Sequence, residues 1–268
     1  MRVRSFYHIR MGRFPEVMER RGWEWWGLYG ALKLAYKVVV LDKRSEEAMK
    51  RFLPSERVVR LPNGIDLLPL SDGRTLPKSL IVLYAGHLIP TKGLKELMEA
   101  WRELRPQGWC LWLAGRGSDA YKKELVGIVG PHAGVEFLGD LPPKEAWECM
   151  QIAQIFVLPT YTEGFPNVIL EAMAAGKAII STHVGAIPEM LDADSDEPCG
   201  LVIKPRDAEI LVASLRQLLL DSQLRETLGR RARAKVAQSY TTGVVFSRLL
   251  HLWSDGASTK DCADEQMF

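Results

Sequence analysis

The feature of this sequence that most constrains its fold is a regular alternation of short apolar runs and helical segments from Leu80 onward. The apolar runs cover residues 80–86, 109–115, 135–139, 155–159, 178–182 and 200–204. Helices are expected after them, at about residues 92–103, 120–129, 144–153, 167–175, 187–191 and 207–220. Continuous apolar strands that alternate with helices predict a parallel sheet covered on both faces. We therefore predict an α/β domain with a doubly wound, Rossmann-like parallel sheet, whose ligand lies beyond the carboxyl ends of the strands.

The residues before Leu80 have a looser organisation. Short strands are expected at residues 4–9, 38–40 and 57–61, and a short helix at 45–52 with Ser45 as a candidate N-cap. So few strands are not expected to bury a parallel core of their own. Residues 67–79 contain Pro, Gly, Ser and Asp without periodicity, which is typical of a linker.

The chain changes character again after about Tyr240. Residues 244–253 are apolar at helical spacing, and a polar tail follows them. We therefore divide the chain into residues 1–66, a linker at 67–79, a main domain at 80–240, and a terminal helix with its tail at 241–268.

Charge and cysteine content narrow the class of protein. The net charge of +2 argues against a dedicated nucleic-acid binder, although residues 1–60 hold 14 basic against 7 acidic side chains. The four cysteines are scattered without metal-ligand spacing, which favours a reducing compartment. The N-terminus has no apolar leader segment, and lysines interrupt the apolar stretch at 27–41. We expect a cytoplasmic protein.

Two loops at strand ends are candidates for a ligand site. In the first, Gly86 lets a ligand approach the backbone, and Lys92 stands at a helix start, where a cation can reach a phosphate. The alternative is an ordinary loop with a solvated lysine. In the second, Gly115 and Arg116 follow the strand at 109–115, and the glycine permits either a close backbone approach or a tight turn.

The loop and helix at residues 162–174 carry the strongest signal. Glu163 precedes the helix and Glu171 lies one turn into it, while the N–H groups near residues 167–169 could hold a phosphate. Carboxylates beside a phosphate site make electrostatic sense if they accept hydrogen bonds from sugar or ribose hydroxyls. The alternative is that both glutamates merely favour the first half of the helix.

These strings together resemble glycosyltransferase family 4, the "glycosyl transferases group 1". The similarity covers about residues 36–240 and is carried, in the family's order, by NGID, AGHLIPTKG, LAGRGS, VEFLGDLPPKE, EGFPNVILEAMA, STHVGAIPEML and GLVIKP. It implies a GT-B fold, of which residues 80–240 form the donor-binding domain and residues 1–66 are a remnant of the N-terminal, acceptor-binding domain. Members are retaining enzymes that need no metal ion, so no cofactor is expected.

The resemblance also assigns roles to residues. Glu171 binds the ribose hydroxyls, Glu163 contacts the donor sugar, and Lys92 neutralises the diphosphate as it leaves. Backbone amides after Gly164 meet the sugar or the distal phosphate. The implied donor-binding set is Gly86, His87, Lys92, Gly115, Arg116, Phe137, Leu138, Glu163, Gly164, Phe165, Asn167, Val168 and Glu171, with Phe137 and Leu138 at the base pocket.

Two histidines need separate comment. The family commonly has Arg at the position of His87, where two guanidinium N–H groups can bind the diphosphate together. With His87 this contact is lost unless a charged imidazole replaces it. The alternative is that His87 is buried and neutral. The segment at residues 8–14 resembles a family loop near the active site. By that resemblance His8 is a catalytic histidine facing the donor sugar, with Arg10 and Arg13 near an anionic group; alternatively His8 is a plain strand residue.

The predicted function is transfer of a hexose from a UDP- or GDP-sugar to an acceptor hydroxyl with retention. The acceptor is expected to be a sugar or a lipid-linked molecule, as in polysaccharide, lipopolysaccharide or glycolipid biosynthesis. One alternative is a nucleotide-sugar-binding module that needs a partner chain for the missing half; another is a sugar-nucleotide epimerase. The basic, Trp-rich stretch at residues 20–26 suits peripheral contact with the inner face of a membrane, or else a core or domain interface.

Overall fold

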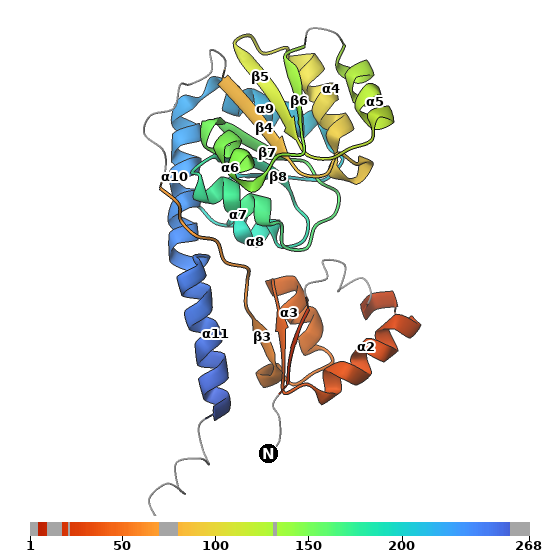
Figure 1. Ribbon diagram of the computed structural model, residues 1–268, viewed down its shortest axis with the longest axis vertical. Coiled ribbons are helices and arrows are strands. Elements are labelled where there is room, and N and C mark those ends of the chain that lie inside the picture. Colours follow the sequence, from red (N-terminus) through yellow and green to blue (C-terminus); the bar gives the residue numbers. More distant parts are fainter. Residues whose placement is uncertain (1–4, 10–17, 21, 70–79, 131–132, 258–268) are drawn as a thin grey trace, which may run out of the picture.

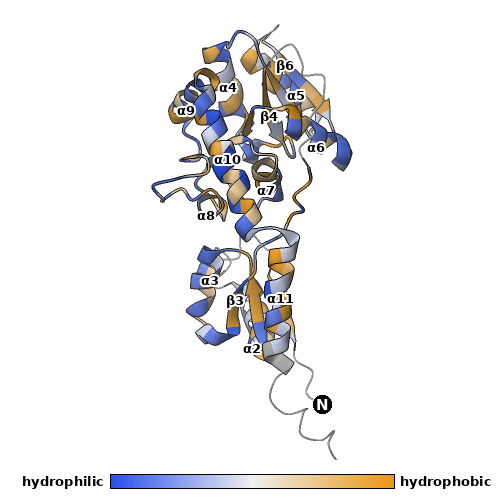
Figure 2. Ribbon diagram, turned by 90° about the vertical axis from the view of Figure 1, so that its left-hand side faces the viewer, coloured by the Kyte–Doolittle hydropathy of each residue, from blue (hydrophilic) through white to orange (hydrophobic). Residues whose placement is uncertain are grey.

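The structure is a computed structural model of the chain, and it describes residues 5–9, 18–20, 22–69, 80–130 and 133–257. Two bodies lie one above the other along the long axis, a large one built on a six-stranded sheet and a small one built on a three-stranded sheet (Figures 1 and 2). Both sheets are parallel throughout the described part of the chain.

The large sheet confirms the predicted doubly wound α/β fold. Its strands are β4 (Leu80–Ala85), β5 (Trp109–Ala114), β6 (Val135–Gly139), β7 (Ile155–Leu158), β8 (Ala178–Thr182) and β9 (Leu201–Ile203). They are arranged in the order β6-β5-β4-β7-β8-β9. The chain therefore builds outward from β4 in one direction, then returns to β7 and builds in the other. The switch point lies between β4 and β7, where ligands bind in folds of this type.

Every helix expected in the large body is present. These helices are α4 (Leu94–Leu104), α5 (Asp119–Val129), α6 (Pro143–Ile152), α7 (Asn167–Ala174), α8 (Ile187–Met190) and α9 (Ala208–Leu220). Their bounds agree with the prediction to within one residue, except that α4 starts two residues late because a short 3-10 turn, η2 (Pro90–Lys92), precedes it. Residues 81–84 of β4 are buried at every position, as expected for a strand covered on both faces.

One long helix, α10 (Ser222–Ser239), is absent from the predicted elements. Its sequence is mostly polar, and only a narrow stripe that includes Leu228, Ala232 and Val236 is buried. The stripe packs against α7 and β8. Gly229 allows the approach, because a Cβ at that position would overlap the carbonyl of Gly176.

The small body corrects the expectation that so few strands cannot bury a core. Its strands β1 (Phe6–His8), β2 (Lys37–Val40) and β3 (Val58–Arg60) lie in the order β1-β2-β3, with η1 (Ser55–Arg57) before β3. Helix α2 (Trp23–Leu34) supplies the missing apolar surface: Trp25 and Leu32 are buried with β2 and with Met49 of α3 (Lys43–Lys50). The Trp-rich stretch therefore belongs partly to a core.

The N-cap predicted for α3 is also wrong. The cap is Asp42, whose Oδ1 accepts from the Ser45 backbone N–H at 2.8 Å. Its Oδ2 accepts from the Ser45 hydroxyl, also at 2.8 Å. Both residues are preferred N-caps, and the earlier one starts the helix because β2 ends two residues before it.

The last helix, α11 (Thr242–Ala257), leaves the large body and runs down beside the small one (Figures 1 and 2). Its start is tied to the connector between the bodies, since the Ile65 N–H donates to the Tyr240 carbonyl at 2.8 Å and the Thr242 N–H donates to the Ile65 carbonyl at 3.1 Å. Among the helices in the described ranges, none is long and apolar enough to cross a membrane.

Candidate functional site

The carboxyl ends of the two sheets face each other. Glu189 of α8, which follows β8, accepts from the Lys43 backbone N–H at 2.8 Å and pairs with Arg60. Lys43 follows β2, and Arg60 is the last residue of β3. A cavity of about 580 Å³ lies between the start of α3 and the loop from β8 to α8. The residues that line this cavity lie around α8 and α3, and the predicted donor-binding residues are not among them.

The loops after β4 and β5 are joined through their glycines. The Gly86 N–H donates to the Ala114 carbonyl at 2.9 Å, and a Cβ on Gly115 would overlap the carbonyl of Gly86. Both glycines have φ in the region that favours glycine, at 152° and 142°. Gly115 therefore allows a close backbone approach, and the group that approaches it in the structure is the neighbouring loop.

His87 follows Gly86 in the loop after β4, which is joined to the loop after β5. Its carbonyl accepts from the Tyr84 hydroxyl at 2.8 Å, and burial raises the pKa of Tyr84, so the donor stays protonated. The His87 side chain is exposed. His87 is therefore not buried, contrary to that alternative.

Lys92 and Glu163 are brought together as an ion pair. Lys92 comes from η2 and Glu163 from the loop between β7 and α7, and their side chains are only 18% and 16% exposed. The next residue, Gly93, has a φ of 68° and leaves no room for a Cβ against the Pro159 carbonyl. Loops on the two sides of the switch point are thus fixed against each other, with one cation and one anion between them.

The loop that carries Glu163 is supported from the β8 side. The Ala186 N–H donates to the Gly164 carbonyl at 2.8 Å. Gly185, at a φ of 55°, lies so close that a Cβ would overlap the carbonyls of Glu163 and Gly164. Sequence reasoning did not single out Gly185, although the matched string STHVGAIPEML contains it.

The first turn of α7 offers backbone donors that no side-chain cap in the described part of the chain satisfies. Pro166 precedes the helix and offers no side-chain cap, so the N–H groups of Asn167 and Val168 lie in a first turn without intrahelical acceptors. The prediction of a third donor, the Ile169 N–H, is wrong, because this group already donates to the Pro166 carbonyl at 3.0 Å. The Asn167 side chain accepts from the Asn63 amide at 2.8 Å, which ties the connector to this site.

Glu171 lies on α7 and is half-buried. Burial raises the pKa of its carboxyl group, and no partner for the carboxylate is found among the residues that the structure describes. A partly desolvated carboxylate without an internal donor is suited to hydroxyl groups from a ligand. Phe165 packs its ring edge-on against that of Tyr240, with the ring centroids 6.1 Å apart.

The remaining predicted residues lie farther apart. Arg116 pairs with Asp140 at 2.7 Å on the surface, and Phe137 and Leu138 are half-buried on the edge strand β6. His8 is exposed at the carboxyl end of β1, on the other sheet. Arg10 and Arg13 fall outside the described residues. No cluster of three His, Cys, Asp or Glu side chains that could hold a metal occurs in the described ranges.

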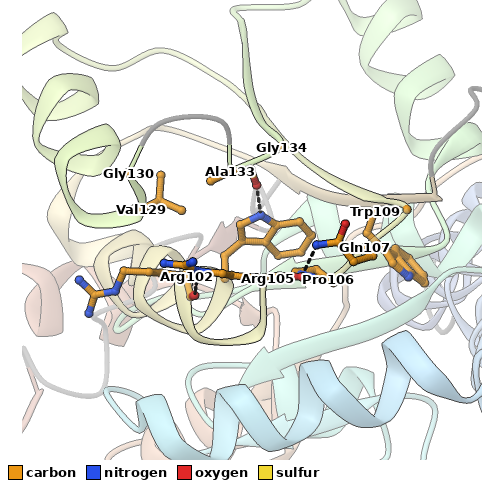
Figure 3. Close-up of a pocket in the computed structure, with 11 residues that line it drawn as sticks. Arg102, Arg105, Pro106, Gln107, Trp109, Val129, Gly130, Ala133 and Gly134 are labelled. Atoms are coloured by element: carbon orange, nitrogen blue, oxygen red, sulfur yellow. Dashed lines mark hydrogen bonds between the residues drawn. The ribbon is translucent and has the colours of Figure 1, made fainter.

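A second cavity, of about 480 Å³, lies at the opposite edge of the large sheet (Figure 3). Its walls are the ends of α4 and α5 and the residues just before β5. Arg102 donates to the Ile128 carbonyl at 3.2 Å, and Trp101 donates to the Ala133 carbonyl at 2.7 Å. Arg102 therefore satisfies a carbonyl at the C-terminus of α5. The cavity lies at the amino ends of the strands, away from the site of Lys92 and Glu163.

Comparison with known proteins identifies related chains. The family described as "Glycosyl transferases group 1" matches residues 72–235. Sulfoquinovosyl transferase SQD2 of Arabidopsis thaliana is 29% identical over 189 residues, which cover 70% of this chain and 34% of the relative. Phosphatidyl-myo-inositol mannosyltransferase of Mycolicibacterium smegmatis is 29% identical over 212 residues, covering 75% of this chain and 53% of the relative. The chain thus spans about half the length of these relatives or less.

Solved structures share the fold. Sucrose-phosphate synthase from Thermosynechococcus elongatus superimposes with a TM-score of 0.82 at 23% identity, over 97% of this chain and 69% of that one. Anabaena HepE, solved in complex with UDP and glucose, superimposes with a TM-score of 0.77 at 20% identity, over 93% of this chain and 71% of that one. Both are neighbours of the GT-B type, which confirms the predicted fold class.

Proposed function

This chain belongs to the group 1 glycosyltransferases, and from that premise we propose that its large sheet binds the nucleoside diphosphate sugar of a retaining hexosyl transfer. The observation that carries the proposal is Glu171, a half-buried carboxylate one turn into α7 that has no partner among the described residues. In the proposed mode it accepts hydrogen bonds from the two ribose hydroxyls. These donors offset the desolvation that raises its pKa.

The diphosphate lies, in this proposal, across the first turn of α7. The N–H groups of Asn167 and Val168 and the helix dipole favour an anion there, as at other helix N-termini. Lys92 supplies the cation, and its pair with Glu163 keeps it in place before the donor arrives. The base contacts Phe137 and Leu138, the sugar contacts Glu163, and His87 faces the diphosphate.

Transfer breaks the bond between the anomeric carbon and the diphosphate oxygen and forms a bond from that carbon to an acceptor oxygen. The acceptor hydroxyl gives up its proton, which ends on the departing nucleoside diphosphate. Lys92 and the amides of α7 stabilise the negative charge that develops on that leaving group. His8 is proposed to face the sugar from the small sheet, and no metal ion is required.

The whole protein is proposed to act in polysaccharide, lipopolysaccharide or glycolipid biosynthesis, as the names of its relatives suggest. UDP is the first choice of nucleotide, because HepE was solved with UDP and glucose, and GDP is the alternative. A lipid-linked acceptor agrees with peripheral membrane contact through α2, where Trp23 is 84% and Trp26 58% exposed. Such a protein would act at the cytoplasmic face.

Calorimetric titration with UDP and with GDP tests the donor site. We expect micromolar binding of one nucleotide by the wild type, a loss of at least tenfold in Glu171→Gln, and no change in Glu226→Gln. Glu226 is the matched control because it is an exposed glutamate of α10 away from the site. Its neighbour Arg225 lies over Trp109, at the amino end of β5, whereas the proposed site is at the carboxyl ends of the strands.

The outcome also separates the alternatives. Binding without transfer to any acceptor, in a folded protein, would favour a nucleotide-sugar-binding module that depends on a partner chain. Conversion of a bound UDP-sugar to its epimer would favour an epimerase on the same scaffold. Failure to bind either nucleotide would overturn the proposal.

A further inference from the structure

Glu189 joins the two bodies through a single carboxylate. Its Oε2 accepts from the backbone N–H of Lys43 at 2.8 Å, and its Oε1 pairs with Arg60. Lys43 begins α3 and Arg60 ends β3, so one side chain of the large body holds two elements of the small body. The Glu189 side chain is 31% exposed, which leaves it partly shielded from water.

The contact with Lys43 completes the N-terminus of α3. The first N–H groups of a helix have no intrahelical acceptor, and a carboxylate beside them is favoured by the helix dipole. Asp42 satisfies the Ser45 N–H at 2.8 Å from within the small body. The acceptor for the Lys43 N–H in the described structure is Glu189, so this amide reports on contact between the bodies.

Glu189 is also fixed to the loop that carries the candidate donor-binding residues. The segment before α8 is held against that loop by the bond from the Ala186 N–H to the Gly164 carbonyl, at 2.8 Å. At the end of α8, the Lys235 ammonium donates to the carbonyl of Glu189 at 2.6 Å. The small body is therefore connected, through a short hydrogen-bonded segment, to the loop of Glu163.

We propose that Glu189 is a positioning residue that clamps the carboxyl ends of the two sheets at the separation that the transfer requires. For its effect on turnover the inference rests on the proposed function. Because the proposed nucleotide contacts all lie on the large body, loss of the clamp leaves nucleotide affinity intact and lowers turnover. The clamp itself is a property of the fold and is tested separately.

Amide hydrogen exchange measured by NMR tests the clamp. We expect the Lys43 amide of the wild type to exchange at least tenfold more slowly than an unprotected amide. In Glu189→Ala, that protection is lost, while the Ser45 amide keeps its own. Glu197→Ala is the matched control, because Glu197 pairs with Arg231 at 2.8 Å within the large body, and its removal leaves Lys43 unchanged. An unprotected Lys43 amide in the wild type, or equal loss at Lys43 and Ser45, would overturn the inference.

Turnover distinguishes a clamp from a purely structural contact. With UDP-glucose as donor and water as acceptor, Glu189→Ala is expected to lower kcat at least tenfold and to leave the Kd for UDP within twofold of the wild type. Glu189→Gln, which keeps an acceptor for Lys43, recovers part of the rate. An unchanged kcat in Glu189→Ala contradicts the positioning role. Absence of UDP and GDP binding in the wild type counts against the proposed function and leaves the exchange result to decide the clamp.

Discussion

Replacement of Gly185 by alanine isolates how strongly the loop from β8 to α8 supports the loop of Glu163. Gly185 has a φ of 55°, and its added Cβ would overlap two carbonyl oxygens, those of Glu163 and Gly164. Neither carbonyl belongs to a flexible side chain, so the backbone of one loop must move. The substitution therefore combines a conformational cost with a packing cost.

The two costs can be estimated separately. A left-handed conformation costs a residue with a Cβ about 1–2 kcal/mol relative to glycine. Overpacking a close contact adds about 1–3 kcal/mol. Gly108→Ala is the matched control, because Gly108 has a φ of 78° and a Cβ there would meet nothing within 4 Å. Gly108→Ala therefore has the conformational cost without the packing cost.

Urea unfolding of the two variants, followed by nucleotide titration, gives the answer. We expect Gly185→Ala to lose about 1–3 kcal/mol more stability than Gly108→Ala, and nucleotide affinity to fall at least tenfold only in Gly185→Ala. Equal stabilities and equal affinities for the two variants would refute the argument that these carbonyls pack directly on Gly185.

Three further changes test other parts of the structure. Lys92→Met leaves the mostly buried Glu163 without its cation and is expected to lower the free energy of unfolding in urea by about 1–3 kcal/mol. The double variant Lys92→Met with Glu163→Gln is expected to regain most of that stability. A double variant as unstable as Lys92→Met would argue against the ion pair. Burial lowers the pKa of Lys177 to about 8 from its usual 10.5, so the unfolded chain binds more protons than the folded chain between these two pH values. The free energy of unfolding of the wild type should therefore rise with pH across this window relative to that of Lys177→Met. Parallel pH profiles of the two proteins would contradict this. Asp221→Ala removes the side-chain acceptor of the Leu224 N–H at the start of α10 and should cost about 1 kcal/mol, with nucleotide binding unchanged, as calorimetry would verify.

The large sheet could be predicted because its strands are buried on both faces. Such strands are continuous apolar runs, and the turns between them interrupt the pattern clearly. Helix α10 could not be found in the same way, because its buried stripe is narrow and the rest of its surface is charged. The core of the small body was missed for a different reason. Trp25 is buried while Trp23 and Trp26 are exposed, so large apolar side chains lie on both faces of α2 and hydropathy does not mark the buried face.

The residues of the candidate site were named from the sequence, but their contacts with one another were not. Spacing placed Glu163 and Lys92 at strand ends, but the pairing of one with the other depends on the strand order, which brings β4 beside β7. The same limit applies to Gly185 and Glu189. Their roles come from contacts across loops and between bodies, at sequence separations that local patterns do not encode.

The central claim, that the loops at the carboxyl ends of the large sheet hold a nucleoside diphosphate sugar, is tested most directly by a crystal structure with UDP or GDP bound. The account predicts ribose hydroxyls within hydrogen-bond distance of Glu171 and the diphosphate on the first turn of α7 beside Lys92. A nucleotide bound elsewhere, for example in the cavity at the amino ends of the strands, would contradict it.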